Sequence, residues 1–194
     1  MNNRVSLPVR IAICGLQWYL EHHVMPTQDS PPIAALLDEV ASNNNPEERL
    51  LLTELQTRCA GVFVSYHVRS TDELRGCIGT ISATTSNVLT EICRNTVSAG
   101  TNDPRFSPIS RDELPELTCS VDILGVAEPI ENADELDVKR YGVIVSKGWR
   151  RGLLLPDLEG VDSVEYQIAI ALSKAGIHAS ESYRMERFEV IRYE

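Results

Sequence analysis

The segment Leu74–Thr80, which reads Leu-Arg-Gly-Cys-Ile-Gly-Thr, constrains the fold of this chain more than any other stretch. Its alternation predicts a β-strand, in which successive side chains point to opposite faces of a sheet. Leu74 and Ile78 would then face a core, whereas Arg75 and Cys77 would face the other way. Glycine weakens a strand, so the two glycines that flank the cysteine indicate a place where another group approaches the main chain closely.

Composition limits the classes of function. The 194 residues predict one globular domain, residues 1–194, and the net charge of −10 disfavours general binding of nucleic acid. The chain has no apolar run long enough to span a membrane and no secretory signal pattern, so we expect a cytoplasmic protein without a membrane partner. Its five cysteines are odd in number and lack the spacing of metal ligands, and no nucleotide-binding fingerprint is present. We therefore expect no metal and no cofactor.

Hydrophobic periodicity predicts a mixture of helices and strands. Helices are expected at residues 6–22, 33–41, 47–56, 84–99 and 161–175. Gly100 is expected to stop the fourth in a left-handed cap, and Gly176 is expected to end the fifth. Strands are expected at residues 62–67, 74–80, 117–123, 141–146, 152–155 and 187–193. Because the two kinds of element do not alternate regularly along the chain, the pattern favours an α+β fold.

The strands at 62–67 and 74–80 are predicted to form a hairpin, because a polar stretch separates them. If its loop centres near Thr71, Ser65 lies opposite Cys77 and His67 lies opposite Arg75. A register shifted by two residues would place Phe63 opposite Cys77 instead, and the sequence leaves both registers open.

Four stretches of the chain resemble those of a known family. They are Gly61–Val64 with Leu74–Thr80, Asp103–Phe106 with Glu113–Leu114, Arg151–Pro156, and Lys174–Ile177. Their order and spacing over roughly residues 61–177 are similar to the AMMECR domain family, whose prokaryotic members include AmmeMemoRadiSam system protein A. The chain departs from the family at Leu172, where members often have cysteine, and at Ser182 and Tyr183, where they often have tryptophan.

The resemblance implies an α+β fold that is two-lobed within a single domain, with a mainly antiparallel sheet flanked by helices. It divides the chain into a helical N-terminal part (1–60), the family-defining region (61–177) and a C-terminal strand (178–194). It further implies an interlobe cleft lined by the signature segment. It implies no settled activity, but it suggests partnership with a Memo-like protein and a radical S-adenosylmethionine (SAM) enzyme.

Cys77 is the candidate catalytic residue. A thiolate is the reactive form of cysteine, and a nearby Arg75 would lower the thiol pKa. His67 is the only histidine that the sequence places near enough to act as a general base. The alternative interpretation makes Cys77 a small buried residue in a crowded strand.

The candidate ligand-binding residues surround the same segment. They are Gly76, Gly79, Thr80, Asp103 and Arg105. Main-chain N–H groups beside the glycines would be open to an oxyanion, and Arg75 with Arg105 would clamp a small anionic molecule. The alternative is that both arginines pair with local acids, Asp72 or Glu73 for Arg75 and Asp103 for Arg105.

Two functions follow from this site. The first is binding of a small anionic ligand, or cysteine-dependent chemistry, within a system that includes a Memo-like protein and a radical SAM enzyme. The second is a non-catalytic adaptor that docks a protein partner on the same residues.

Overall fold

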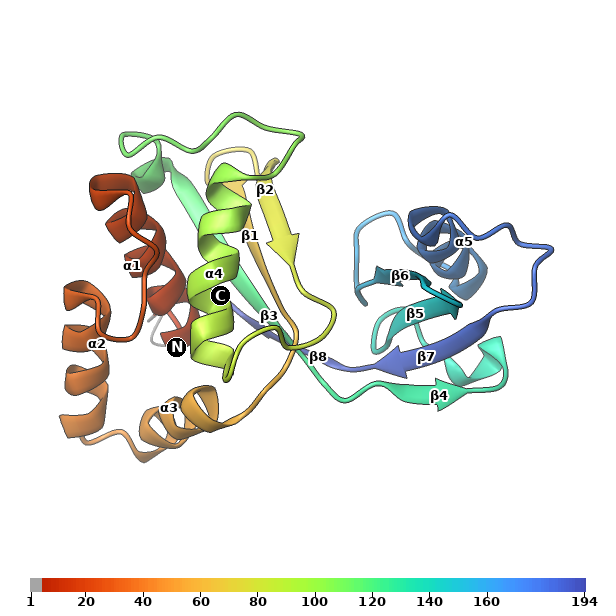
Figure 1. The fold of residues 1–194 in the computed structure, drawn as a ribbon, viewed down its shortest axis with the longest axis horizontal. Coiled ribbons are helices and arrows are strands. Elements are labelled where there is room, and N and C mark those ends of the chain that lie inside the picture. Colours follow the sequence, from red (N-terminus) through yellow and green to blue (C-terminus); the bar gives the residue numbers. More distant parts are fainter. Residues whose placement is uncertain (1–4) are drawn as a thin grey trace. The chain divides into compact units, whose positions relative to one another are not determined.

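The computed structural model describes residues 5–194, which divide into two compact units (Figure 1). The first unit extends to Ile123 and includes Arg192–Glu194, and the second comprises Leu124–Ile191. Each unit contains one four-stranded sheet, and the strand pairings are antiparallel. The α+β expectation is therefore confirmed.

Unit 1 contains most of the helices. Its elements are α1 (Leu7–His22), α2 (Pro31–Ser42), α3 (Pro46–Thr57), β1 (Val62–Val68), β2 (Leu74–Gly79), α4 (Val88–Thr101), the short 3-10 helix η1 (Leu114–Glu116), β3 (Leu117–Leu124) and β8 (Val190–Tyr193). The last residue of β3 and the first two of β8 fall within the bounds of unit 2. The sheet order is β2-β1-β3-β8, which makes β2 an edge strand.

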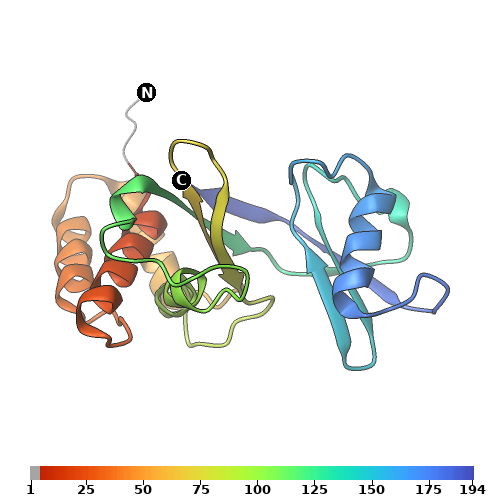
Figure 2. The ribbon, with the colours of Figure 1, turned by 90° about the horizontal axis from the view of Figure 1, so that it is seen from above.

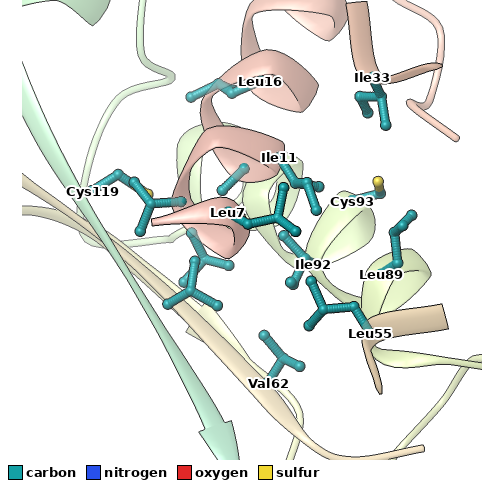
Figure 3. Packing of buried hydrophobic residues seen from close by; sticks show 14 of the residues in the cluster. Leu7, Ile11, Leu16, Ile33, Leu55, Val62, Leu89, Ile92, Cys93 and Cys119 are labelled. Atoms are coloured by element: carbon teal, nitrogen blue, oxygen red, sulfur yellow. The ribbon is translucent and has the colours of Figure 1, made fainter. Parts of the chain in front are cut away.

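The core of unit 1 lies between helices α1 and α4 and one face of this sheet. Figure 3 shows Leu7 and Ile11 of α1 beside Ile92 of α4, with Val62 of β1 below them. These side chains are buried because the apolar positions of each helix recur every three to four residues, which gathers them on one face. A hydrogen-bonded pair crosses this core, since the buried Tyr66 hydroxyl lies 2.5 Å from Thr96 Oγ1.

Unit 2 is a smaller sheet covered by one helix. Its elements are β4 (Glu128–Ile130), the 3-10 helix η2 (Ala133–Glu135), β5 (Gly142–Lys147), β6 (Arg150–Leu154), α5 (Val164–Ala175) and β7 (Arg184–Phe188), and the sheet order is β4-β7-β5-β6. Figure 2 shows α5 lying across the strands. Gly152 permits this packing, because a Cβ atom there would lie 2.2 Å from the carbonyl oxygen of Ala171.

The larger departures from the predicted bounds are in helix α4 and in the last predicted strand. Helix α4 starts at Val88 because the Asn87 side chain accepts the N–H of Thr90 at 2.9 Å, and it continues to Thr101, past Gly100. The predicted strand 187–193 is two strands, β7 and β8, which belong to different sheets. By contrast, Gly176 ends α5 as predicted, and the structure places it in the left-handed conformation with φ of 63°.

Among residues 5–194, no helix combines the length and the apolar character that a membrane crossing requires.

Candidate functional site

The β1–β2 hairpin has the first of the two predicted registers around Cys77. Ser65 is the partner of Cys77, as expected. His67, however, pairs with Leu74 and not with Arg75, because the register shifts between Tyr66 and His67. The shift leaves Arg75 as the additional residue of a β-bulge, a feature that turns a side chain away from its regular direction.

Alternation divides the sheet of unit 1 into two faces. One face carries the buried Val62, Val64 and Tyr66 of β1 against the helices. The opposite face carries Ser65 of β1, Cys77 of β2, and Ser120 and Asp122 of β3, and we call these four residues the polar face. Ser65 is opposite both Cys77 and Ser120, so a thiol and two hydroxyls form one row across three strands.

The Cys77 thiol is half-buried on this face and hydrogen-bonded to the Ser65 side chain. Burial raises the pKa of the thiol, while the Ser65 hydrogen bond and the charge of Arg105 lower it to a smaller extent. Asp122 and Asp103 add to the rise in pKa. Cys77 is thus a neutral thiol at neutral pH.

Asp103 and Arg105 close the free edge of β2 beside Cys77. Asp103 Oδ2 accepts the backbone N–H of Cys77 at 2.9 Å, and Arg105 Nη2 lies 3.4 Å from the Cys77 carbonyl oxygen. Asp103 also accepts from Arg105 Nε at 2.9 Å and from Nη2 at 2.7 Å. Pairing of Arg105 with Asp103 is therefore confirmed, and the hydrogen bonds from Arg105 hold the pKa of the buried Asp103 far below its usual range.

Arg75 is held by an acid that is distant in sequence. Its guanidinium binds both carboxylate oxygens of Glu113 and donates to the carbonyl oxygen of Ser107 at 2.9 Å. The alternative interpretation, in which Arg75 pairs with Asp72 or Glu73, is wrong in its partner, because Arg75 at the bulge reaches the segment before η1. The positive charge that lowers the Cys77 pKa comes from Arg105.

His67 lies too far from Cys77 along the hairpin to act as its general base. Its partner Leu74 precedes Cys77 by three residues, a separation of about 10 Å along a strand. Within residues 5–194, no hydrogen bond joins the His67 ring to Cys77. The residue that contacts the thiol from β1 is Ser65.

The two glycines of the segment have separate packing reasons. A Cβ atom on Gly76 would lie 2.3 Å from the carbonyl oxygen of Ala99, so glycine allows α4 to approach β2. A Cβ atom on Gly79 would lie 2.2 Å from Cγ of Phe63, whose ring covers it. Close approach at both positions was expected, but the approaching groups belong to the protein itself.

Thr80 belongs to a buried network that sequence reasoning missed. Its hydroxyl donates to Glu91 Oε1 at 2.7 Å and accepts from Asn95 Nδ2 at 3.2 Å. Glu91, fully buried, also accepts from the backbone N–H groups and hydroxyls of Thr84 and Thr85. The sequence signal for this network was Glu91 itself, an acidic residue among the apolar positions of helix α4.

Asp122 is the second functional candidate that sequence reasoning missed. Its buried carboxylate accepts from Arg192 Nε at 2.8 Å and from Nη2 at 3.0 Å. Its place in the alternating strand 117–123 was a usable signal, because that pattern puts it on the same face as Ser120. The polar face therefore has a thiol and two hydroxyls, while the carboxylates of Asp122 and Asp103 already accept from arginines.

The described residues contain no cluster of three or more His, Cys, Asp or Glu side chains that could hold a metal ion.

Comparisons with known proteins agree with this fold. The AMMECR1 family profile matches residues 30–194. A Thermotoga maritima protein is 53% identical over 141 residues, covering 72% of this chain and 80% of its own length. A Clostridium acetobutylicum protein is 49% identical over 140 residues, which cover 72% of this chain but only 29% of that longer protein. The crystal structure of an uncharacterised Pyrococcus horikoshii protein matches with a TM-score of 0.75 and 27% identity, over 96% of this chain and 89% of that one.

Proposed function

This chain belongs to the AMMECR1 family, and we propose that it binds a small anionic molecule at the polar face, beside Cys77 and Arg105. One observation supports the proposal above the others. The face offers hydrogen-bond donors from the Ser120 hydroxyl and from one free proton of the hydrogen-bonded Ser65–Cys77 pair, while its nearby carboxylates are already occupied by arginines. A ligand that brings its own negative oxygen atoms complements this arrangement.

Arg105 supplies the positive charge of the proposed site. Its side chain is 55% exposed, although Asp103, which holds it, is only 2% exposed. The hydrogen bonds to Asp103 use Nε and Nη2, so Nη1 is the donor that we assign to the ligand. A guanidinium fixed in this way loses little freedom on binding an anion, which favours affinity.

Cys77 acts in this proposal as a contact residue with a protonated thiol. Burial raises its pKa, and the described residues place no histidine against its sulfur. Deprotonation by a bound substrate would be required before the thiol could act as a nucleophile. The same polar face thus supports binding more directly than catalysis.

Affinity labelling tests the proposal with two reagents that differ in charge. We would measure alkylation of Cys77 by anionic iodoacetate and by neutral iodoacetamide, using mass spectrometry of the Cys77 peptide. The rate ratio of the two reagents should be about fivefold higher in the folded protein than in urea, as about 1 kcal/mol of attraction to Arg105 implies.

Two arginine variants make the labelling experiment decisive. Arg105→Gln should return the rate ratio to its value in urea, and Arg105→Lys should retain part of the preference. Arg151→Gln is the matched control, because Arg151 is also a surface arginine paired with an acid, Glu186 at 3.3 Å. A ratio that is the same in folded and unfolded protein, or that survives Arg105→Gln, would contradict the proposal.

We further propose that the ligand serves a system containing a Memo-like protein and a radical SAM enzyme. This part rests on the family resemblance alone. Copurification with the Memo-like protein should persist in Cys77→Ala while the activity of the system falls. Retained copurification with full activity would instead favour the adaptor function.

A further inference from the structure

A second site lies on the opposite side of the unit 1 sheet from Cys77. It is a cavity of about 360 Å³ between α1, η1 and the start of β3. Its lining residues are Ile13, Gln17, Tyr66, Arg69, Arg111, Leu114, Pro115, Leu117, Thr118 and Cys119. The volume falls within the range of roughly 300–1,000 Å³ that is usual for small-molecule pockets.

The cavity has an apolar interior. Tyr66, Leu117 and Cys119 form its buried wall, and Ile13 and Leu114 are half-buried beside them. The Tyr66 hydroxyl is already hydrogen-bonded to Thr96, so Tyr66 contributes its aromatic ring to the cavity wall. An occupant would therefore need an apolar body to replace water against these side chains.

Two arginines, Arg69 and Arg111, line this apolar cavity. They are notable because acidic residues outnumber basic ones in the chain by 28 to 18. Arg69 is fixed there, because its Nη2 donates to the Leu117 carbonyl oxygen at 2.7 Å and its backbone N–H donates to Glu116 at 2.8 Å. In the part of the chain that the structure describes, no carboxylate lies within 4.0 Å of the Arg69 guanidinium.

Arg111 is engaged only loosely. Its Nη2 lies 2.8 Å from Glu21 Oε1, and its side chain is 67% exposed. Exposed ion pairs of this kind contribute little and exchange readily for another anion. Among the residues that the structure describes, the cavity thus combines an apolar interior with one guanidinium that has no acidic partner and a second that is easily released.

We infer that this cavity binds a small carboxylate with an apolar body, whose carboxylate contacts Arg69 and Arg111 and whose hydrocarbon part lies between Ile13, Leu114 and Leu117. Arginine presents the planar donor fork that a carboxylate fits. The inference is independent of the function proposed for the polar face, since Cys77 and Arg105 do not line this cavity.

Octanoate, octylammonium and 1-octanol are the probes, because they share one hydrocarbon chain and differ in charge. Isothermal titration of the full chain should show octanoate binding at least about tenfold more tightly than either other compound. Arg69→Gln should weaken octanoate binding by about fivefold or more. Arg94→Gln is the matched control, an exposed arginine of α4 that does not line the cavity, and should change the affinity less than about twofold.

Two further variants keep the test informative. Leu114→Trp should fill the cavity and abolish binding while circular dichroism shows an intact fold. If that variant does not fold, Arg69→Glu replaces it and should bind octylammonium in preference to octanoate. Equal affinity for octanoate and 1-octanol, unchanged binding in Arg69→Gln, or no octanoate binding up to about 5 mM would overturn the inference.

Discussion

The carboxylate of Asp103 lies 2.9 Å from the backbone nitrogen of Cys77, so a side chain from the loop after α4 completes the edge of strand β2. With Arg105 donating toward the Cys77 carbonyl oxygen, the two side chains take the place of a neighbouring strand. Exposed strand edges promote association between chains, and pairing this edge prevents it. The residues beside the proposed ligand site therefore also protect the sheet.

Asp103→Asn should destabilise the protein by about 1–3 kcal/mol, because the amide keeps the Cys77 contact but loses the charge-assisted bonds to Arg105. Urea unfolding measures the loss. Asp112→Asn is the control, an exposed aspartate of the same unit, and should change the free energy of unfolding by less than about 0.5 kcal/mol.

The cost of Asp103→Asn should also depend on pH. Arg105 lowers the pKa of Asp103 in the folded state, so its stabilisation is complete above the unfolded pKa and is lost as pH falls through the folded pKa. The difference between wild type and variant should hold from pH 7 to about pH 5 and shrink below about pH 4. A difference that grew on acidification would rule out this assignment.

Gly76→Ala should destabilise the protein by at least about 2 kcal/mol, because its Cβ would lie 2.3 Å from a backbone oxygen of α4. Gly148→Ala provides the comparison and should cost only about 1 kcal/mol, since Gly148 has φ of 58° but a Cβ atom there would meet no other atom within 4 Å. Thermal unfolding of both variants measures the difference, and an equal loss would show that backbone conformation, not helix approach, sets the requirement.

Glu91→Gln should cost about 1–2 kcal/mol and Glu91→Ala more than about 3 kcal/mol. Oε2 accepts two backbone N–H groups, from Thr84 and Thr85, whereas Oε1 accepts only hydroxyls, which can turn to accept from an amide. Hydrogen exchange should report the local effect, with faster exchange of the Thr84 and Thr85 amides in Glu91→Ala. Exchange that stays as slow as in wild type would argue against the network.

The pH profile of Cys77 alkylation should reveal its raised pKa. Because burial disfavours the thiolate, the iodoacetamide rate at Cys77 should continue to rise above pH 9.0, the ordinary thiol value. In urea, the same cysteine should level off near that value. Ser65→Ala should slow the reaction further, since the lost hydrogen bond lowers the thiol pKa in the wild type. A folded-state midpoint below pH 8 would instead indicate an activated nucleophile.

Local sequence patterns were enough to predict the elements around the site and to narrow the partner of Cys77 to Ser65 or Phe63, and the structure selects Ser65. Hydrophobic periodicity is a local property, so strands β1, β2 and β3 and the five long helices are visible in the order of residues. Alternation likewise places Cys77 and Asp122 on definite faces. The glycines beside Cys77 correctly indicated close approach to the main chain.

The tertiary structure decides which charged side chains form ion pairs with each other. Arg75 binds Glu113 rather than its sequence neighbours because a bulge turns it, and Asp122 binds Arg192 from a strand 70 residues away. Such pairings depend on how distant segments are brought together, and no local pattern encodes the partner of a charge. The same reason separates β7 from β8, because which sheet a strand joins is set by long-range pairing and not by its own alternation.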